Sequence, residues 1–311
     1  MSRISIVVPL RAADTTAFED TLASILRNLP DRCQIVVAHD GSYSDPHDLK
    51  SIGVKVVHVC DARSYGELYF AAISHCTAPI VHWLRPGVTV DESWCESAID
   101  QFENSQVAAV TPLIVSDDHL DRILTAGITC GSGYRIKLVG SGNRVGIGIR
   151  LDPLGPSAWA AFYRRSYLRA VSLQINQHVA GNFDLELALS FRALGWLNVV
   201  DVNSVASMEH PAELSRSYQM VSGRDTQRIL WRHHPGTLLG SLKTTMTAGI
   251  SELLSSLVSP RRGLHGLQRL AAATQFARRR ELQKSLAALR HAVAQARTVP
   301  AASSPATRTA A

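Results

Sequence analysis

Carboxylates that could act on a bound ligand occur in two segments far apart in the sequence. The first segment is His39-Asp40-Gly41-Ser42, which follows an apolar run. The second is Phe183–Trp196, where Asp184 and Glu186 stand at the start of a stretch with helical character. A carboxylate that reaches a substrate hydroxyl can remove its proton as a general base. The same residue types also suit a plain β-turn and an acidic first helical turn, which form without any chemistry.

Alternating strands and helices must position these carboxylates. Short apolar and β-branched runs are typical of buried parallel strands, and stretches with apolar residues at helical spacing separate them. This rhythm predicts an α/β fold with a mainly parallel sheet and right-handed crossovers. The predicted strands are Ile4–Pro9, Gln34–Ala38, Val54–Val59, Ile80–Leu84, Val107–Val115, Ala158–Tyr163 and Leu197–Val202. The predicted helices are Thr16–Leu29, Gly66–Cys76, Asp91–Glu103 and Asp184–Leu194, and residues 127–148 are expected to form glycine-rich loops.

Ligands of such sheets bind beyond the carboxyl ends of the strands. Pro9, Asp40, Asp61, Arg63 and Arg85 each stand at or just after the end of a predicted strand. We therefore expect these five residues to line one ligand-binding edge of the sheet.

The segment Val36–Asp45 resembles the strand-end motif of family 2 glycosyltransferases, in which two acids, Gly and Ser precede a variable residue and Asp. His39 replaces the first acid, whereas Asp40, Gly41 and Ser42 match. Upstream, Ile6–Pro9 resembles that family's opening strand. Further on, Ala160–Ser166 is similar to the strand and Arg-Arg helix start that precede its acceptor site.

Phe183–Trp196 is similar to the same family's Glu-Asp-x-Asp-Leu helix, which ends in Arg-x-x-Gly-Trp. The resemblance implies that Asp184 is the base, that Glu186 is the second acid, and that His210 lies near the diphosphate. It implies a GT-A fold, the Rossmann-like fold of nucleotide-diphospho-sugar transferases, over residues 1–235. It further implies inverting transfer of a sugar from a nucleotide-diphosphate sugar to a hydroxyl acceptor. Such an acceptor is a glycan, a polysaccharide of the cell envelope or a lipid-linked molecule.

The chain departs from this family where the fourth strand normally ends in Asp-x-Asp, which holds Mg²⁺ or Mn²⁺. Here the sequence is Leu84-Arg85-Pro86-Gly87, so the Asp-x-Asp ligands of that divalent metal are absent. The sequence therefore leaves undecided whether the protein uses Mg²⁺ or Mn²⁺ as a cofactor. Arg85 is expected to supply positive charge to the diphosphate instead, because a guanidinium fork suits phosphate oxygens. The alternative is a catalytically inactive glycosyltransferase-like protein that binds a nucleotide sugar or serves as a scaffold. The sequence contains neither a Gly-x-Gly-x-x-Gly motif after its first strand nor a Walker loop. This absence weakens the interpretation of the chain as a dinucleotide-binding protein or an ATPase.

Positive charge is concentrated at the end of the chain. Residues 261–311 hold ten Lys and Arg against the single acid Glu281, a net charge of +9 within a total of +6, so the remaining 260 residues carry −3. This distribution argues against a nucleic-acid-binding enzyme face. Residues 236–297 are expected to form a basic amphipathic helical extension and residues 298–311 a disordered tail.

The extension is expected either to lie on an anionic membrane surface or to pack on the domain as a solvated helix. No run of about 18 apolar residues and no signal-peptide apolar region occurs in the sequence. We therefore expect a cytoplasmic protein that contacts the inner face of the membrane only peripherally.

Overall fold

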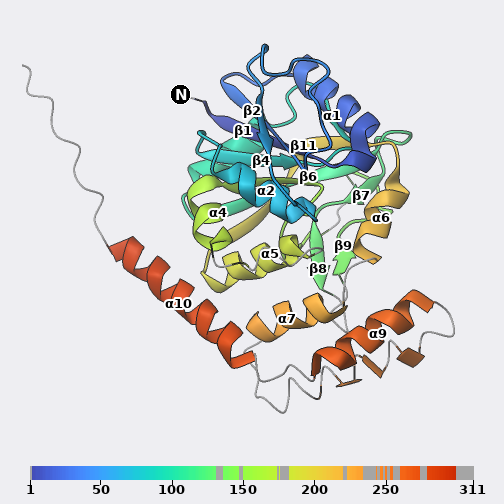
Figure 1. Ribbon diagram of the computed structural model, residues 1–311, viewed down its shortest axis with the longest axis vertical. Coiled ribbons are helices and arrows are strands. Elements are labelled where there is room, and N and C mark those ends of the chain that lie inside the picture. Colours follow the sequence, from blue (N-terminus) through green and yellow to red (C-terminus); the bar gives the residue numbers. More distant parts are fainter. Residues whose placement is uncertain are drawn as a thin grey trace, which may run out of the picture.

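The computed structural model describes residues 2–130, 136–146, 150–173, 175, 182–219, 223–233, 243, 246–247, 249–250, 253–254, 260–273 and 279–298. Over these residues the protein has a mixed α/β architecture in which helices flank a curled nine-stranded sheet (Figure 1). The predicted alternation of strands and helices is therefore confirmed.

The first half of the sheet is parallel. Its order is β3 (Lys55–His58), β2 (Cys33–His39), β1 (Ile4–Leu10) and β4 (Ile80–Leu84), and each adjacent pair is parallel. The carboxyl ends of these four strands therefore lie at the same edge of the sheet.

The second half mixes directions. The order continues with β10 (Ala160–Arg164), β6 (Val107–Ser116), β11 (Leu197–Met208) and β5 (Val88–Val90), while β7 (Ile123–Thr125) pairs with β6. Strand β10 runs antiparallel to β4, and its first residue Ala160 pairs with Leu84 at the end of β4. The residues just before β10 are thus brought to the carboxyl edge of β4.

The sheet is buried on both faces. Alternate residues of a strand point to opposite sides, so each face contributes its own side chains to a core cluster. Along β1, Ile4, Ile6, Val8 and Leu10 join one core cluster, and Val7 joins the other. The first cluster packs under α1 (Thr15–Arg27) and α3 (Glu96–Asp100). The second packs under α2 (Tyr65–Ile73), α4 (Arg165–Ser172) and α5 (Phe183–Ala193). Burial on both sides explains why these strands read as continuous apolar runs.

The helices after the sheet are α6 (Pro211–Gln219), α7 (Gly223–His233), α9 (Pro260–Ala273) and α10 (Arg279–Thr298). Helix α10, drawn in red in Figure 1, places Leu286 and Leu289 in the second core cluster. The tail predicted to be disordered lies outside the described residues from position 299 onward. None of the described helices combines the length and the apolar character that crossing a membrane requires.

Several elements differ from the sequence-based expectation. The helix predicted over Asp91–Glu103 is only α3, extended by the 3-10 turn Gln101–Glu103. Strand β5 has only three residues, too few for a periodicity to show. In the glycine-rich stretch, the short strands β8 (Ile128–Cys130) and β9 (Ile136–Leu138) pair with each other, so the described part contains more than loops.

Candidate active site

Asp184 lies in the first turn of α5, and its side chain is buried, with 1% exposed. Its Oδ2 accepts hydrogen bonds from the backbone N–H of Ala158 (3.1 Å) and the hydroxyl of Tyr218 (2.5 Å). Its Oδ1 accepts one from the backbone N–H of Leu185 (2.8 Å). Burial raises the pKa of Asp184, and these hydrogen bonds offset only part of the rise. A carboxylate with a raised pKa is a stronger base than an ordinary aspartate.

Two adjacent residues of α6, Ser217 and Tyr218, contact Trp159 and the Asp184 carboxylate respectively. Burial, followed by the charge of Asp184, raises the pKa of Tyr218 well above its ordinary value. The Tyr218 hydroxyl therefore keeps its proton and acts as the donor to Asp184. One residue earlier, Ser217 accepts a hydrogen bond from the indole Nε1 of Trp159 (3.1 Å). Helix α6 thus ties Asp184 to the segment that precedes β10.

Arg85 follows the end of β4, and its guanidinium lies between two aromatic rings. Its Cζ is 3.9 Å from the ring centroid of Tyr65 and 4.1 Å from that of Trp159. Its backbone N–H donates to the carbonyl of Trp159 (2.9 Å), which fixes the strand end against the segment before β10. Stacking on two faces holds the guanidinium in one plane and leaves its N–H groups pointing along that plane.

A second arginine approaches the same tyrosine from the end of β1. The Cζ of Arg11 lies 5.7 Å from the ring centroid of Tyr65. The hydroxyl of Tyr65 makes a short hydrogen bond to Oδ2 of Asp14. Ser64, the N-cap of α2, accepts a hydrogen bond from the backbone N–H of Glu67 (3.3 Å), so the helix that carries Tyr65 begins at a defined residue.

Asp40 stands at the carboxyl end of β2 in a tight turn. Its Oδ1 accepts hydrogen bonds from the hydroxyl of Ser42 (2.5 Å) and from its backbone N–H (3.2 Å). Partial burial raises the pKa of Asp40, but the Ser42 hydrogen bonds and the charge of Arg11 outweigh it, so the net pKa is lowered. His39, which replaces the family's first acid, is buried and stacks on His58 at a centroid distance of 5.2 Å. Asp40 is therefore the ionised carboxylate at this strand end.

The other predicted donor residues occupy the same edge of the sheet. Pro9 is buried in β1 opposite Ala38, beyond the last residue that pairs with β4, so its missing N–H breaks no bond to that strand. Asp61 and Arg63 are exposed in the loop after β3. Asp61 has a left-handed backbone, with φ of 57°.

Glu186, the second acid that the resemblance implies, pairs with two basic side chains of α7. Its side chain is 3% exposed, and its Oε1 contacts Nη1 of Arg232 (2.7 Å) and Nε2 of His233 (3.0 Å) in α7. These partners hold the carboxylate inside the protein. Glu186 therefore fastens α5 to α7, whereas Asp184 belongs to the carboxyl edge of the sheet.

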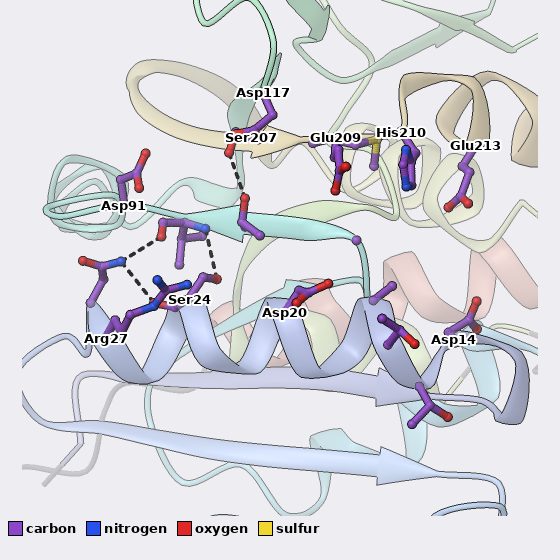
Figure 2. Close-up of a pocket in the computed structure, with 18 of the residues that line it drawn as sticks. Asp14, Asp20, Ser24, Arg27, Asp91, Asp117, Ser207, Glu209, His210 and Glu213 are labelled. Carbon is purple, nitrogen blue, oxygen red and sulfur yellow. Dashed lines mark hydrogen bonds between the residues drawn. The ribbon is translucent and has the colours of Figure 1, made fainter.

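A pocket of about 920 Å³ lies beside this edge, between α1, β5 and the start of α6 (Figure 2). Figure 2 shows Asp14 at one end of α1 and Arg27 at the other, with His210 and Glu213 toward the Asp14 end. Its charged lining is mainly acidic, formed by Asp14, Asp20, Asp91, Asp117, Glu209 and Glu213. His210 lines this pocket, but Asp40, Arg85 and Asp184 do not.

Contacts join the edge residues into one site. Asp184 bonds to Tyr218, the adjacent Ser217 bonds to Trp159, and Trp159 stacks on Arg85. Arg85 and Arg11 share the ring of Tyr65, and the charge of Arg11 acts on Asp40. The structure thus connects the two predicted carboxylates, Asp184 and Asp40, through Arg85, which the sequence analysis named, and through Tyr218, Ser217, Trp159 and Tyr65, which it did not.

The metal that the resemblance implies does not fit these residues. At the end of β4, where two carboxylates would bind it, stands a guanidinium clamped between two rings. In the described part of the chain, no three His, Cys, Asp or Glu side chains come together as a metal site requires. A fixed positive charge at this place repels a divalent cation.

No family model matches the chain, and no curated protein matches it in sequence. Among solved structures, it is similar to the mannosyltransferase PcManGT from Pyrobaculum calidifontis in complex with GDP-Man and Mn²⁺. That match has a TM-score of 0.52 and 15% identity over 94% of this chain and 86% of that chain. GalNAc-T7 with UDP, GalNAc and Mn²⁺ matches with a TM-score of 0.56 and 11% identity, over 74% of this chain and 48% of its own. TarS 1–349 of S. aureus in complex with UDP matches with a TM-score of 0.53 and 10% identity, over 94% and 92%.

These neighbours are glycosyltransferases, and the likeness at such identities establishes the fold alone. The chain has the GT-A fold, which confirms the fold class expected from the sequence. It spans about half the length of the GalNAc-T7 chain.

Proposed function

We propose that this protein transfers a sugar from a nucleotide-diphosphate sugar to a hydroxyl acceptor, with inversion at the anomeric carbon. The observation that supports this function best is the run of contacts from Asp184 through Trp159, Arg85 and Tyr65 to the Asp40 edge of the sheet. The neighbours with bound GDP-Man or UDP support a donor of the nucleotide-sugar class.

In this proposal Asp40 binds the nucleotide base, because an ionised carboxylate accepts hydrogen bonds from base N–H groups. Pro9, Asp61 and Arg63 line the nucleoside side of the donor, and Arg85 faces the diphosphate. Asp184 takes the proton of the acceptor hydroxyl while that oxygen bonds to the anomeric carbon. The bond between the anomeric carbon and the diphosphate oxygen breaks, and the electron pair leaves with the nucleoside diphosphate.

Charge decides which side of the site receives the donor. The acidic pocket repels a diphosphate, whereas Arg11 and Arg85 attract it. Asp14 and Gly87 line the pocket, and both also border the arginine side, through Tyr65 and Trp159 respectively. We therefore propose that the body of the acceptor lies on the pocket side, where His210 lies, and that its reacting hydroxyl extends from there to Asp184.

One observation favours the alternative of a binding protein without turnover. Asp184 is buried, and hydrogen bonds from Tyr218, Ala158 and Leu185 occupy its oxygens. An acceptor hydroxyl reaches this carboxylate only if α6 moves Tyr218 aside. A protein in which α6 never moves would bind the donor and release it unchanged.

Turnover and binding of Asp184→Asn separate the two functions. We would incubate the protein with UDP-glucose, UDP-GlcNAc or GDP-mannose and with glycan and lipid-linked hydroxyl acceptors. We would measure release of the nucleoside diphosphate, together with donor binding by calorimetry. The transferase predicts release that Asp184→Asn lowers at least 100-fold with binding kept. Donor binding with no release in either protein would favour the binding protein, and absence of binding would reject both.

We also propose that the basic extension contacts an anionic membrane, which would bring the enzyme to a lipid-linked or envelope acceptor on the cytoplasmic side. Leu264 and Leu267 of α9 are exposed, at 59% and 53%, within the strongly basic end of the chain. Co-sedimentation with phosphatidylglycerol vesicles should fall when residues 260–311 are deleted. Sedimentation unchanged by the deletion would remove this proposal.

A further inference from the structure

Two arginines from neighbouring strands meet at a single tyrosine ring. Arg11 follows β1 and Arg85 follows β4, and the two strands pair in parallel. The Cζ atoms of Arg11 and Arg85 lie 5.7 Å and 3.9 Å from the centroid of Tyr65. Arg11 stands just after the end of β1 but outside every family motif in the sequence, so its pairing with Arg85 is a feature of the fold.

Neither guanidinium has an anionic partner in the described part of the chain. No ion pair and no side-chain hydrogen bond joins Arg11 or Arg85 to another described residue, and the Nε of Arg11 is buried without a partner. The nearby carboxylates contact other groups, since Asp14 accepts from Tyr65 and Asp40 accepts from Ser42, and Arg11 acts on Asp40 only through its charge. Two like charges that approach one ring without a described carboxylate in contact with either leave room for a bound anion, which would interact favourably with both.

The surroundings hold the Arg85 guanidinium in place before any ligand arrives. Trp159 covers the second face of Arg85, and Ser217 holds the indole of Trp159. Asp14 anchors the hydroxyl of Tyr65. Stacked guanidinium groups expose N–H donors along their planes, and this geometry suits the paired oxygens of a phosphate.

We propose that Arg11 and Arg85 together bind the diphosphate of the donor and replace the divalent cation at this site. The inference rests on the proposed function and deepens it, since it names the residues and the charge that hold the leaving group. Each guanidinium contacts one of the two phosphate groups. When the bond to the sugar breaks, negative charge grows on the leaving oxygen, and the fixed donors stabilise it without a metal.

The test measures binding of UDP, GDP, uridine and guanosine by calorimetry. Each ligand is measured once in excess EDTA and once in about 5 mM MnCl₂, which is enough to saturate a weak metal site. Arg11→Met and Arg85→Met remove each charge and keep an unbranched apolar side chain. Arg11→Lys and Arg85→Lys keep the charge but lose the fork. Arg150→Met, which removes an arginine whose side chain is 91% exposed, is the matched control.

We expect the better diphosphate to bind in EDTA as tightly as with Mn²⁺. Each Met variant should weaken binding of this diphosphate about 10- to 100-fold, which corresponds to the loss of a charged hydrogen bond. Each Lys variant should weaken the binding less. Nucleoside binding should stay unchanged in all variants, because Asp40 and not the arginines contacts the base. Melting temperatures of the variants show that each has folded, and the Lys variants stand in for any Met variant that has not.

Two results would overturn the inference in distinguishable ways. Diphosphate binding that needs Mn²⁺ and ignores both arginine substitutions would remove the two-arginine site and leave the proposed function in place. No binding of any nucleotide or nucleoside, with or without metal, would remove the proposed function and the inference with it.

Discussion

Asp184 combines burial with three hydrogen bonds to its carboxylate. Its carboxylate is buried, which raises its pKa, and it accepts three hydrogen bonds that keep the charged form accessible. The strongest of these hydrogen bonds comes from Tyr218, which keeps its proton because burial and Asp184 raise its own pKa. One side chain therefore tunes the proposed base and also covers it.

Tyr218→Phe should move the acid limb of the pH–rate profile to higher pH. The pKa of Asp184 is already raised above the ordinary carboxyl value of 3.8, and the Tyr218 hydrogen bond lowers it. Removal of that hydroxyl raises the pKa further, so a higher pH is needed before Asp184 is ionised and able to accept a proton. The profile of kcat/KM against pH measures this shift. An acid limb at the same or a lower pH would contradict the assignment of Asp184 as the titrating base.

Glu186, two residues after Asp184, stabilises the fold through a buried ion pair with Arg232. Substitution Glu186→Gln should lower the free energy of unfolding by about 3–5 kcal/mol, because it leaves Arg232 buried without a counter-charge. Chemical denaturation measures this loss. The double variant Glu186→Gln/Arg232→Met should recover much of it, since both charges are then gone. For comparison, Arg144→Met breaks an ion pair with Asp121 that is more than half exposed and should cost under about 1 kcal/mol.

At the scale of elements, the turn after β2 depends on a glycine. Gly41 has φ of 99°, and a Cβ there would lie 2.8 Å from Nε2 of His58. Gly53 has a similar φ of 86°, but a Cβ there meets nothing within 4 Å. The pair therefore separates backbone strain from contact with a neighbour.

Gly53→Ala should cost about 1–2 kcal/mol of stability from its left-handed backbone alone, and Gly41→Ala should cost more. Only Gly41→Ala should also weaken nucleoside binding, because it moves the turn that carries Asp40. Thermal denaturation and calorimetry measure the two effects. Equal losses of stability together with unchanged nucleoside affinity would show that this turn does not position the base-binding carboxylate.

The elements that local pattern predicts well are those in which burial imposes a clear period. The strands that end at Leu10, His39 and Leu84 are continuous apolar runs, so their carboxyl ends and the carboxylate after β2 follow from the sequence. Strand β11 runs to Met208, past the predicted end at Val202, because a register shift between Asp201 and Val205 carries it across a polar stretch. A bulge of this kind leaves no periodic signal.

The companions of the predicted site residues follow from tertiary contacts instead. Tyr218 lies 34 residues from Asp184 in the chain, and nothing local to α6 indicates that it folds over α5. Tyr65 and Trp159 become visible only when the end of β4 meets both α2 and the segment before β10. The candidate residues at the sheet edge could therefore be named from the sequence, whereas the residues that hold their charges in place could not.

At the scale of the whole molecule, charge is divided between regions with different partners. The body carries −3 and the last 51 residues carry +9. Within the body, an acidic pocket lies next to two arginines whose side chains contact none of the described carboxylates directly. This division fits a donor held by arginines, an acceptor that approaches over carboxylates, and a basic extension that contacts another anionic surface.

The extension also belongs to the core, which limits how far it can act as a separate module. Leu286 and Leu289 of α10 are each 4% exposed within the second hydrophobic cluster, and the side-chain amide of Gln283 donates to the carbonyl of Trp231 in α7 (3.3 Å). Helix α7 in turn carries Arg232, the partner of Glu186 in α5. Helix α5, which carries Asp184, is therefore linked to α10 through α7.

A chain that ends at residue 278 should accordingly lose stability, and a chain that ends at residue 298 should not. Each buried leucine contributes about 1.5–3 kcal/mol, so removal of α10 should lower the free energy of unfolding by up to about 3–6 kcal/mol. Urea denaturation of the two truncated proteins measures the difference. Because α10 contacts α7 and not the arginine pair, the nucleoside diphosphate should still bind to the fraction that is folded. Equal stability of both truncated proteins would instead mean that the domain ends near residue 235 and that α10 only rests on its surface.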